Sequence, residues 1–237
     1  MIDKKEIVKK CEDVIKYVSK ITPQIQNGEI NWILNGSVVC NILCNIKTIN
    51  GKVVSNDFTA IAEKFLRQPK GDLDFTFREG QNISTKLIDF DSQEIQGFYS
   101  ISKEHRTYNF IDHNGIINER DLNEIAFAET RSGLKLYIKT PDNLFKYKLK
   151  DYFASKFIDK DDERNKQNLH DLTVLYCLSI LWIGAENTNS IIDNIRCYSQ
   201  IMHNLYIEDS TLYQKEIIDI KNKILKSIET QSNQVYR

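Results

Sequence analysis

The sequence predicts an α+β fold in two parts. We expect a mixed sheet with flanking helices in residues 1–140 and a C-terminal helical bundle in residues 141–237. Three observations predict this division. An apolar run at residues 31–34 ends in a glycine and leads into helical spacing, so a strand, a turn and a helix follow one another. From about residue 72 the apolar period becomes two, which is typical of strands. After residue 140 helical spacing returns and is kept nearly to the end.

The first 66 residues contain three helix patterns around one strand. Residues 3–21 form an amphipathic pattern, with apolar side chains recurring at helical spacing. Residues 31–34 read as a strand, and residues 37–46 resume helical spacing. Asn50-Gly51 is a turn signal, and residues 58–66 predict another short helix.

The remainder of the first part alternates in the manner of a sheet. The segments predicted as strands are 72–77, 83–90, 98–102, 106–111, 125–129 and 134–139, with turns at His113-Asn114-Gly115 and Arg131-Ser132-Gly133. In the second part Thr140 is placed to cap a helix that starts at Pro141. Helices are predicted at 141–157, 165–183, 188–206 and 210–230.

Composition excludes several classes of protein. The 237 residues carry a formal net charge of -1, without the strong basic excess of a general nucleic-acid binder. The odd number of cysteines and the lack of a CxxC pair predict neither a disulfide framework nor a structural zinc site. Cys40 and Cys44 are expected to pack in the core. The N-terminus carries no apolar leader, and the longest apolar stretch, 172–183, is too short for a bilayer. We therefore expect a cytoplasmic protein without membrane contact.

An acidic strand is the first candidate for chemistry. In the segment from Gly71 to Phe77, Asp72 and Asp74 alternate with apolar residues and therefore point to the same face. Their positions are separated by about 6.5–7 Å along the strand. Two carboxylates at this spacing can hold one Mg²⁺ or bridge two, as in two-metal phosphoryl-transfer sites. The alternative is that both belong to the solvated face of an edge strand.

A glycine turn is the second candidate. Trp32 to Leu34 is an apolar strand that runs into Gly36 and Ser37, where a helix opens. Backbone N–H groups at such a turn, together with the helix N-terminus, bind anions such as phosphate. Gly36 permits close approach of a phosphate, and the Ser37 hydroxyl can cap the helix or donate to the phosphate. An ordinary strand-turn-helix with a serine cap explains the same two residues.

Together these elements resemble the nucleotidyltransferase superfamily, in which a strand, a Gly-Ser turn and a helix precede a strand with Asp-x-Asp. The resemblance rests on Leu34-Asn35-Gly36-Ser37 and on Asp72-Leu73-Asp74-Phe75. It implies a metal-dependent transferase that uses an NTP as substrate. The stretch between Ser37 and Asp72 is longer than the family's short helix and loop, which an insertion around 47–67 would explain.

The helical part is similar to the AbiEii branch of these enzymes, toxins of type IV toxin–antitoxin systems. Lys148-Leu149 matches the Lys-Leu pair on a helix started by proline, and Asp171-Leu172 matches the end of a later Lys-Asp-x-x-Asp-Leu stretch. Asn168 stands where that stretch has its first Asp. The resemblance implies that Lys148 neutralises triphosphate charge. It also implies RNA such as tRNA as acceptor, and an antitoxin protein as partner.

Helix geometry bears on the same two residues. Lys148 lies at the border of an apolar stripe, where a snorkelling surface lysine is the alternative. Asp171 lies on a helix that is apolar nearly all round, so its carboxylate is expected to be partly buried and to need a partner, for which Lys148 is a candidate. A structural salt bridge is the alternative to a part in catalysis, in which Asp171 positions Lys148 or acts on the acceptor.

Many nucleotidyltransferases use a third acid as the base for the acceptor hydroxyl. The candidates are Asp89, Asp91, Asp112 and Glu129, of which Asp112 ends a predicted strand but also precedes a turn.

The sequence thus predicts a magnesium-dependent nucleotidyltransferase that transfers a nucleotidyl group to a hydroxyl acceptor. The net charge leaves a small molecule or a protein hydroxyl open beside RNA. The competing hypothesis is a catalytically inactive binding or interaction module on the same fold.

Overall fold

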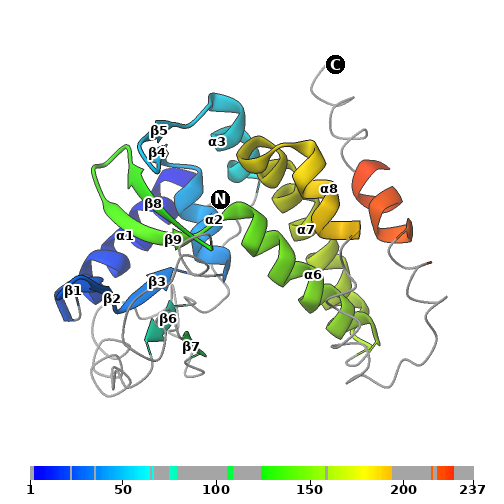
Figure 1. Cartoon of the computed structure of the whole chain (residues 1–237), viewed down its shortest axis with the longest axis horizontal. Coiled ribbons are helices and arrows are strands. Elements are labelled where there is room, and N and C mark those ends of the chain that lie inside the picture. Colours follow the sequence, from blue (N-terminus) through cyan, green and yellow to red (C-terminus); the bar gives the residue numbers. More distant parts are fainter. Residues whose placement is uncertain are drawn as a thin grey trace. The chain divides into compact units, whose positions relative to one another are not determined.

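The computed structural model describes residues 3–21, 23–34, 36–64, 66, 75–78, 106–108, 124–157, 160–193, 215 and 218–226. The chain forms two compact units, Met1–Thr140 and Pro141–Arg237. Their boundary coincides with the position at which the sequence changes from alternating to helical spacing. The protein is a mixed α+β structure, and its elements are labelled in Figure 1.

The first unit combines helices and strands. Its elements are α1 (Lys4–Ile21), β1 (Ile25–Gln26), β2 (Glu29–Ile30), β3 (Trp32–Leu34), α2 (Gly36–Leu43), β4 (Ile46–Ile49), β5 (Lys52–Val53), α3 (Asn56–Glu63), β6 (Phe75–Arg78), β7 (Arg106–Tyr108), β8 (Ile125–Thr130) and β9 (Lys135–Lys139). Strands β1 and β2 pair as a separate hairpin. The other described strands form one mixed sheet in the order β5-β4-β8-β9-β3-β6-β7.

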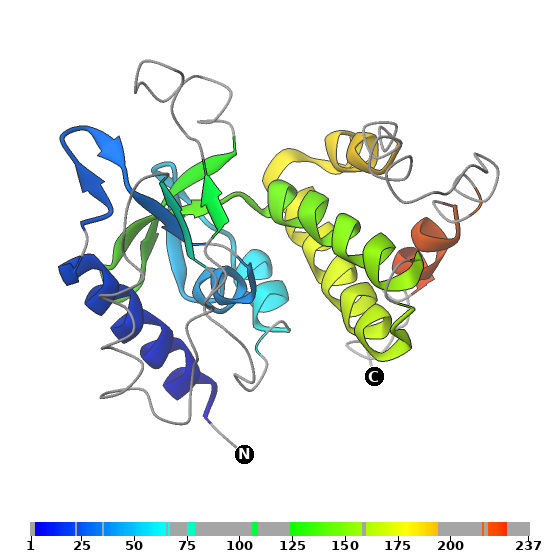
Figure 2. The ribbon, with the colours of Figure 1, turned by 90° about the horizontal axis from the view of Figure 1, so that it is seen from below.

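Strand β3 lies inside this sheet, between β9 and β6. It is parallel to β9 and antiparallel to β6. Its side chains Trp32, Ile33 and Leu34 are all fully buried, which is expected of a strand covered on both faces. Helices α1 and α2 contact each other and lie on one side of the sheet (Figure 2). The apolar run at 31–34 is therefore the centre of the unit's core.

The register of β3 brings three chain segments to one end of the sheet. Leu34, the last residue of β3, pairs with Ile138 near the end of β9 and with Phe75 at the beginning of β6. Because β6 runs antiparallel to β3, it begins where β3 ends. The turn at Gly36 consequently follows β3 at the same end of the sheet at which the chain enters β6.

A buried carboxylate fastens α1 to the sheet. Glu12 is only 4% exposed and accepts hydrogen bonds from the Asn45 amide (2.9 Å) and the Ser132 hydroxyl (2.7 Å). Ser132 belongs to the turn between β8 and β9, and Asn45 precedes β4. Buried carboxylates require such donors, because without them desolvation disfavours the charge. Glu12 thus fixes the helix to two strand ends at once.

Two predicted helices differ in length from those observed. The helix expected over 37–46 ends at Leu43, and Ile46 instead begins β4, which pairs with β8. The helix expected over 58–66 is α3, which starts at Asn56 because the Ser55 side chain accepts a hydrogen bond from the Phe58 N–H. The stretch between the Gly-Ser turn and the acidic segment thus contains a hairpin that extends the sheet, followed by a helix.

The described residues of the second unit are helical. They form α6 (Pro141–Phe157), α7 (Asp162–Ile183), α8 (Ala185–Asp193) and a helical segment at 218–226. Helix α6 has the bounds that the sequence predicts. Helix α7 begins three residues earlier than expected because the Asp161 side chain accepts from the Arg164 N–H as an N-cap.

The expectation for the following helix is corrected in the same way. It begins at Ala185 rather than at residue 188, directly after Gly184, whose positive φ of 88° ends α7. Helix α7 is joined to α8 by a hydrogen bond from the Tyr176 hydroxyl to the Asn189 side chain at 2.8 Å. The predicted strands at 83–90 and 98–102 lie outside the described residues.

Candidate functional site

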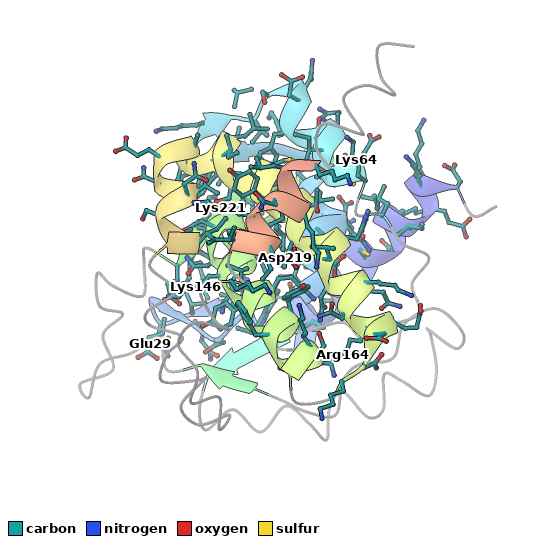
Figure 3. The ribbon with its side chains drawn as sticks, turned by 90° about the vertical axis from the view of Figure 1, so that its right-hand side faces the viewer. Glu29, Lys64, Lys146, Arg164, Asp219 and Lys221 are labelled. Atoms are coloured by element: carbon teal, nitrogen blue, oxygen red, sulfur yellow. The ribbon has the colours of Figure 1, made fainter. Side chains whose placement is uncertain are left out.

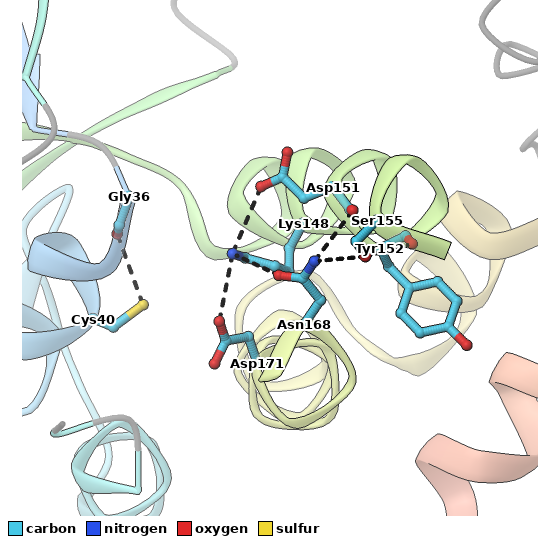
Figure 4. Close-up of polar contacts among 8 residues, drawn as sticks. All are labelled: Gly36, Cys40, Lys148, Asp151, Tyr152, Ser155, Asn168 and Asp171. Carbon is cyan, nitrogen blue, oxygen red and sulfur yellow. Dashed lines mark hydrogen bonds and ion pairs between the residues drawn. The ribbon is translucent and has the colours of Figure 1, made fainter. Parts of the chain in front are cut away.

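Glycine is required at position 36 by the backbone. Gly36 has a φ of +64°, the left-handed region that side chains bearing a Cβ seldom adopt. The residue is the first of α2, which follows the buried strand β3 immediately. Its carbonyl oxygen lies 4.0 Å from the Cys40 sulfur one turn along (Figure 4). The predicted strand, glycine turn and helix are therefore present, and they direct the N-terminus of α2 to one end of the sheet.

The acidic pair precedes the described part of β6 in the sequence. Asp72 and Asp74 lie outside the described residues, as do Asp89, Asp91 and Asp112. The description of β6 begins at Phe75, the residue after Asp74 in the sequence. Phe75 pairs with Leu34, two residues before Gly36. The backbone of Ser37 is described as part of α2.

A lysine that the sequence did not single out ends the neighbouring strand. Lys139 is the last residue of β9 and is 0% exposed, with its Nζ atom buried. It pairs with Ile125, the first residue of the neighbouring strand β8. Lysine is rarely buried in proteins, and its charge requires compensation where it is. In the sequence Lys139 looks like the polar end of an alternating strand, so only the fold reveals its burial.

In the second unit, Lys148 is enclosed by three oxygen atoms. Its Nζ atom lies 3.4 Å from Oδ2 of Asp171, 3.4 Å from Oδ1 of Asn168 and 3.6 Å from Oδ2 of Asp151 (Figure 4). Lys148 and Asp151 are on α6, whereas Asn168 and Asp171 are on α7, one turn apart on the same face. The ion pair between Lys148 and Asp171 that the sequence suggested is present and joins the two helices.

Asn168 is held so that its oxygen faces the lysine. Its amide nitrogen donates to the backbone oxygen of Asp151 and to the Ser155 hydroxyl, both at 3.1 Å. The side chain is only 4% exposed. An aspartate at this position would have no hydrogen to donate to these acceptors. The departure from the AbiEii pattern is therefore matched by its surroundings in this chain.

The cluster permits an exchange of partners at the lysine. An ammonium group has three N–H donors, and here three oxygens surround it. Asp151 is the most distant of them and the most exposed, at 44% against 13% for Asp171. An incoming phosphate oxygen would displace Asp151 most easily, because its carboxylate is already partly hydrated. Asp171 and Asn168 would then continue to hold the amine.

The contacts of Lys148 do not fit the alternative of a surface lysine that extends into water. The side chain of Lys148 is 26% exposed and fixed between two helices. Lys146, on the same helix, is labelled in Figure 3 together with Arg164 near the start of α7. Lys148 thus differs from a lysine that extends freely into water, since its amine is oriented by residues of α7.

Of the candidate third acids, only Glu129 is described. Its carboxylate lies 3.1 Å from Nζ of Lys47, and this ion pair joins β8 to β4. Glu129 therefore has a local structural partner.

Cys40 and Cys44 lie in the core, as expected. Cys11, Cys40 and Cys44 are buried free thiols. Burial is the main cause that raises the pKa of the Cys44 thiol to about 12, and the nearby Glu63 carboxylate adds to the effect.

Within the described parts of the chain, no three His, Cys, Asp or Glu side chains gather closely enough to hold a metal ion.

No described helix is both long enough and apolar enough to cross a membrane. Comparison of the chain with protein-family models, with curated proteins and with solved structures found no match.

Proposed function

We propose that this protein is a metal-dependent nucleotidyltransferase that transfers a nucleotidyl group from an NTP to a hydroxyl acceptor. Asp72 and Asp74 would hold Mg²⁺, and the turn at Gly36 and Ser37 would bind the phosphates. This activity implies a nucleotidyltransferase-like sheet followed by a helical bundle. The mixed sheet and the helical second unit are consistent with such a fold.

One observation carries the proposal. The end of β3, which leads into Gly36, is paired with the beginning of β6, which follows Asp74 in the sequence. A phosphate-binding turn and a pair of metal-binding carboxylates must serve the same substrate, so they have to be brought to one end of a sheet. The pairing of these two strands, which are about forty residues apart in the chain, supports the proposal.

The second unit would contribute Lys148. Its amine would neutralise charge on the triphosphate, and Asp171 and Asn168 would keep it oriented between turnovers. The displaceable contact with Asp151 supports this role, since a lysine locked by three buried partners would have no donor to offer a substrate.

The acceptor follows from the resemblance to AbiEii-like toxins rather than from the geometry. We propose RNA, with tRNA as the first substrate to test, and an antitoxin protein as the partner that would suppress the activity. A chain with a net charge of -1 would have to bind RNA through a local basic surface.

The proposal is tested by incubating the protein with each α-labelled NTP, Mg²⁺ or Mn²⁺, and total RNA or tRNA. We expect label in the RNA fraction that depends on metal and disappears in Asp72→Asn and Asp74→Asn. Each replacement removes one anionic metal ligand and keeps the size of the side chain.

The control is Asp13→Asn, which removes an exposed carboxylate that forms a 3.8 Å ion pair with Lys16 on α1. It should label RNA like the wild type. If no NTP is used with RNA, small-molecule or protein acceptors, the proposal is refuted and the inactive binding module is favoured. Labelling that persists in both aspartate variants refutes the proposed site.

A further inference from the structure

Two hairpins of the first unit are closed by the same dipeptide. Asn27 and Gly28 form the two-residue loop between β1 and β2, and Asn50 and Gly51 form the loop between β4 and β5 (Figure 1). The φ values are 54° and 81° in the first loop and 49° and 76° in the second. Positive φ at both positions is typical of the type I′ turn that Asn-Gly favours. Both loops are exposed, so a chemical difference between them has to come from their contacts.

The second loop is bound to a neighbouring strand. The Oδ1 atom of Asn50 accepts a hydrogen bond from the Phe127 N–H at 2.8 Å, and the Asn50 N–H donates to the Phe127 carbonyl oxygen at 2.7 Å. Phe127 belongs to β8, which lies beside β4 in the large sheet. Asn50 is therefore held to the sheet through its side chain and through its backbone.

The first loop has no contact of this kind. Within the described residues, no hydrogen bond holds the side-chain amide of Asn27. Strands β1 and β2 form a sheet of their own, and a two-stranded hairpin is only marginally stable by itself. Its base is fixed, since Ile30 is 4% exposed and the Asn31 N–H donates to the Gln24 carbonyl oxygen at 2.8 Å. The tip at Asn27 can therefore open while the base stays packed.

An asparagine followed by glycine can react within its own backbone. The glycine nitrogen attacks Cγ of the asparagine, and no side chain on the glycine obstructs the approach. The new N–Cγ bond closes a five-membered imide, the Cγ–Nδ2 bond breaks, and the proton lost from the glycine nitrogen leaves with the amide as ammonia. Water then opens the ring. Breaking the N–Cγ bond gives aspartate, and breaking the bond to the backbone carbonyl gives isoaspartate.

The contact with β8 opposes this reaction at one loop only. The attack requires Cγ to turn toward the following nitrogen, and in Asn50 the oxygen on that carbon is bound to the Phe127 N–H. In Asn27 the side chain turns without breaking such a bond. We propose that Asn27 is a site of spontaneous deamidation, and that Asn50 is protected from the same reaction by its hydrogen bonds to β8.

The modification changes the hairpin in which it occurs. Either product places a new carboxylate two residues from Glu29, which already carries a negative charge. Isoaspartate also lengthens the backbone of a two-residue loop by one carbon, which is incompatible with a type I′ turn between the paired residues Gln26 and Glu29. The hairpin therefore loosens at its tip as the protein ages.

The first test compares both sites in one sample of wild-type protein at pH 8. Native protein and protein unfolded in guanidinium chloride are digested at intervals, and fragmentation mass spectrometry assigns each deamidation to its residue. The unfolded chain should deamidate at both sites with rates that agree within about threefold, because neither site is then held. In the native protein Asn27 should react about tenfold faster than Asn50, which corresponds to about 1.4 kcal/mol, the scale of the hydrogen bonds that must break.

The inference is overturned if the native ratio of the two rates exceeds the unfolded ratio by less than about threefold, since the hydrogen bonds of Asn50 would then give no protection. Asn27→Asp is the control for the assignment, because it should abolish the mass gain at this position and leave the one at Asn50. Fragmentation also separates the two sites from Asn35-Gly36 and Asn114-Gly115, whose asparagines lie outside the described residues.

The second test addresses the hairpin and uses hydrogen exchange. The isoaspartate form, separated by chromatography, should exchange the amide hydrogens of Gln26 and Glu29 faster than the unmodified protein. Asn27→Asp adds the charge without the extra backbone carbon, and it should exchange like the unmodified protein because aspartate also fits this turn. Equal exchange in the isoaspartate form and the unmodified protein would overturn the proposed loosening.

Discussion

Two ion pairs involving α7 allow a test of how burial, rather than distance, determines the strength of an ion pair. Lys148 and Asp171 are 3.4 Å apart, with side chains 26% and 13% exposed. Lys166 and Glu163 are closer, at 2.7 Å, but are 72% and 79% exposed. We expect the longer, enclosed pair to contribute more to stability than the shorter, exposed one.

The magnitude follows from Coulomb's law and the cost of desolvation. At 3.4 Å the attraction between unit charges is about 1.2 kcal/mol in water and about 5 kcal/mol at an effective dielectric constant of 20. Partial burial of both partners places the pair between these limits, and desolvation offsets part of the gain. We therefore expect a coupling free energy of about 1–2 kcal/mol for Lys148 and Asp171.

The exposed pair is expected to contribute nothing measurable, because water solvates both of its partners. Its hydrogen bond and attraction to Glu163 raise the pKa of Lys166, but the amine is exposed to solvent and salt screens the interaction. The contrast between the two pairs is thus a difference in surroundings.

The assay is a double-mutant cycle for each pair, using Lys→Met with Asp→Asn or Glu→Gln, in urea unfolding. The chain has two tryptophans, Trp32 in the first unit and Trp182 in α7. A Trp32→Phe background leaves Trp182 fluorescence as a reporter of the second unit, which avoids treating two units as one transition. Coupling of the exposed pair equal to or above that of the enclosed pair would refute the reasoning.

Three further predictions concern the first unit and are measured by urea unfolding followed by Trp32 fluorescence. Gly36→Ala should destabilise the unit by about 1–2 kcal/mol because of the positive φ, and Gly36→Asn should cost less, since asparagine tolerates this region better; equal stability of both with the wild type would contradict the backbone argument. Between pH 9 and 12 the stability should fall as pH rises, because the thiol of Cys44 ionises only in the unfolded state while its raised pKa of about 12 keeps it protonated in the native one. Cys44→Ala should flatten this part of the profile, and an unchanged slope would speak against it. Glu12→Ala should cost about 1–3 kcal/mol, since it leaves the Ser132 and Asn45 donors without their acceptor, whereas Glu12→Gln should cost less; a neutral Glu12→Ala would show that water replaces the carboxylate.

Local signals in the sequence predict the helices well. The helix predicted over 3–21 is α1 at Lys4–Ile21, and the one started by Pro141 has the predicted bounds. Both combine strong periodicity with residues that favour a helix start or end. The Asn27-Gly28 pair, with φ values of 54° and 81°, is a hairpin signal of the same local kind, and it makes the small hairpin of β1 and β2 predictable.

Strand β4 shows where local reasoning fails. Ile46 continues the spacing of α2 at i+4 from Ile42, so the pattern predicts a longer helix. In the structure Ile46 pairs with Thr130, more than eighty residues later. That pairing determines the secondary structure, and nothing near Ile46 in the sequence reveals it.

In the candidate site, too, some features can be predicted from local sequence and others depend on the fold. The ion pair of Lys148 and Asp171 was predictable because a carboxylate on an otherwise apolar helix needs a partner. The burial of Lys139 was not, because it depends on the folded sheet, in which β9 lies between β8 and β3. The alignment of Gly36 with the start of β6 depends equally on register, which a strand pattern does not specify.

The position of β3 also governs when the first unit can form during translation. Its wholly apolar segment leaves the ribosome about a hundred residues before β9, the parallel neighbour that completes its hydrogen bonding. At ordinary elongation rates this interval lasts roughly 5–20 s. Until β9 emerges, the nascent chain therefore carries an apolar strand without its parallel partner, and an unpaired strand edge of this kind promotes association with other chains.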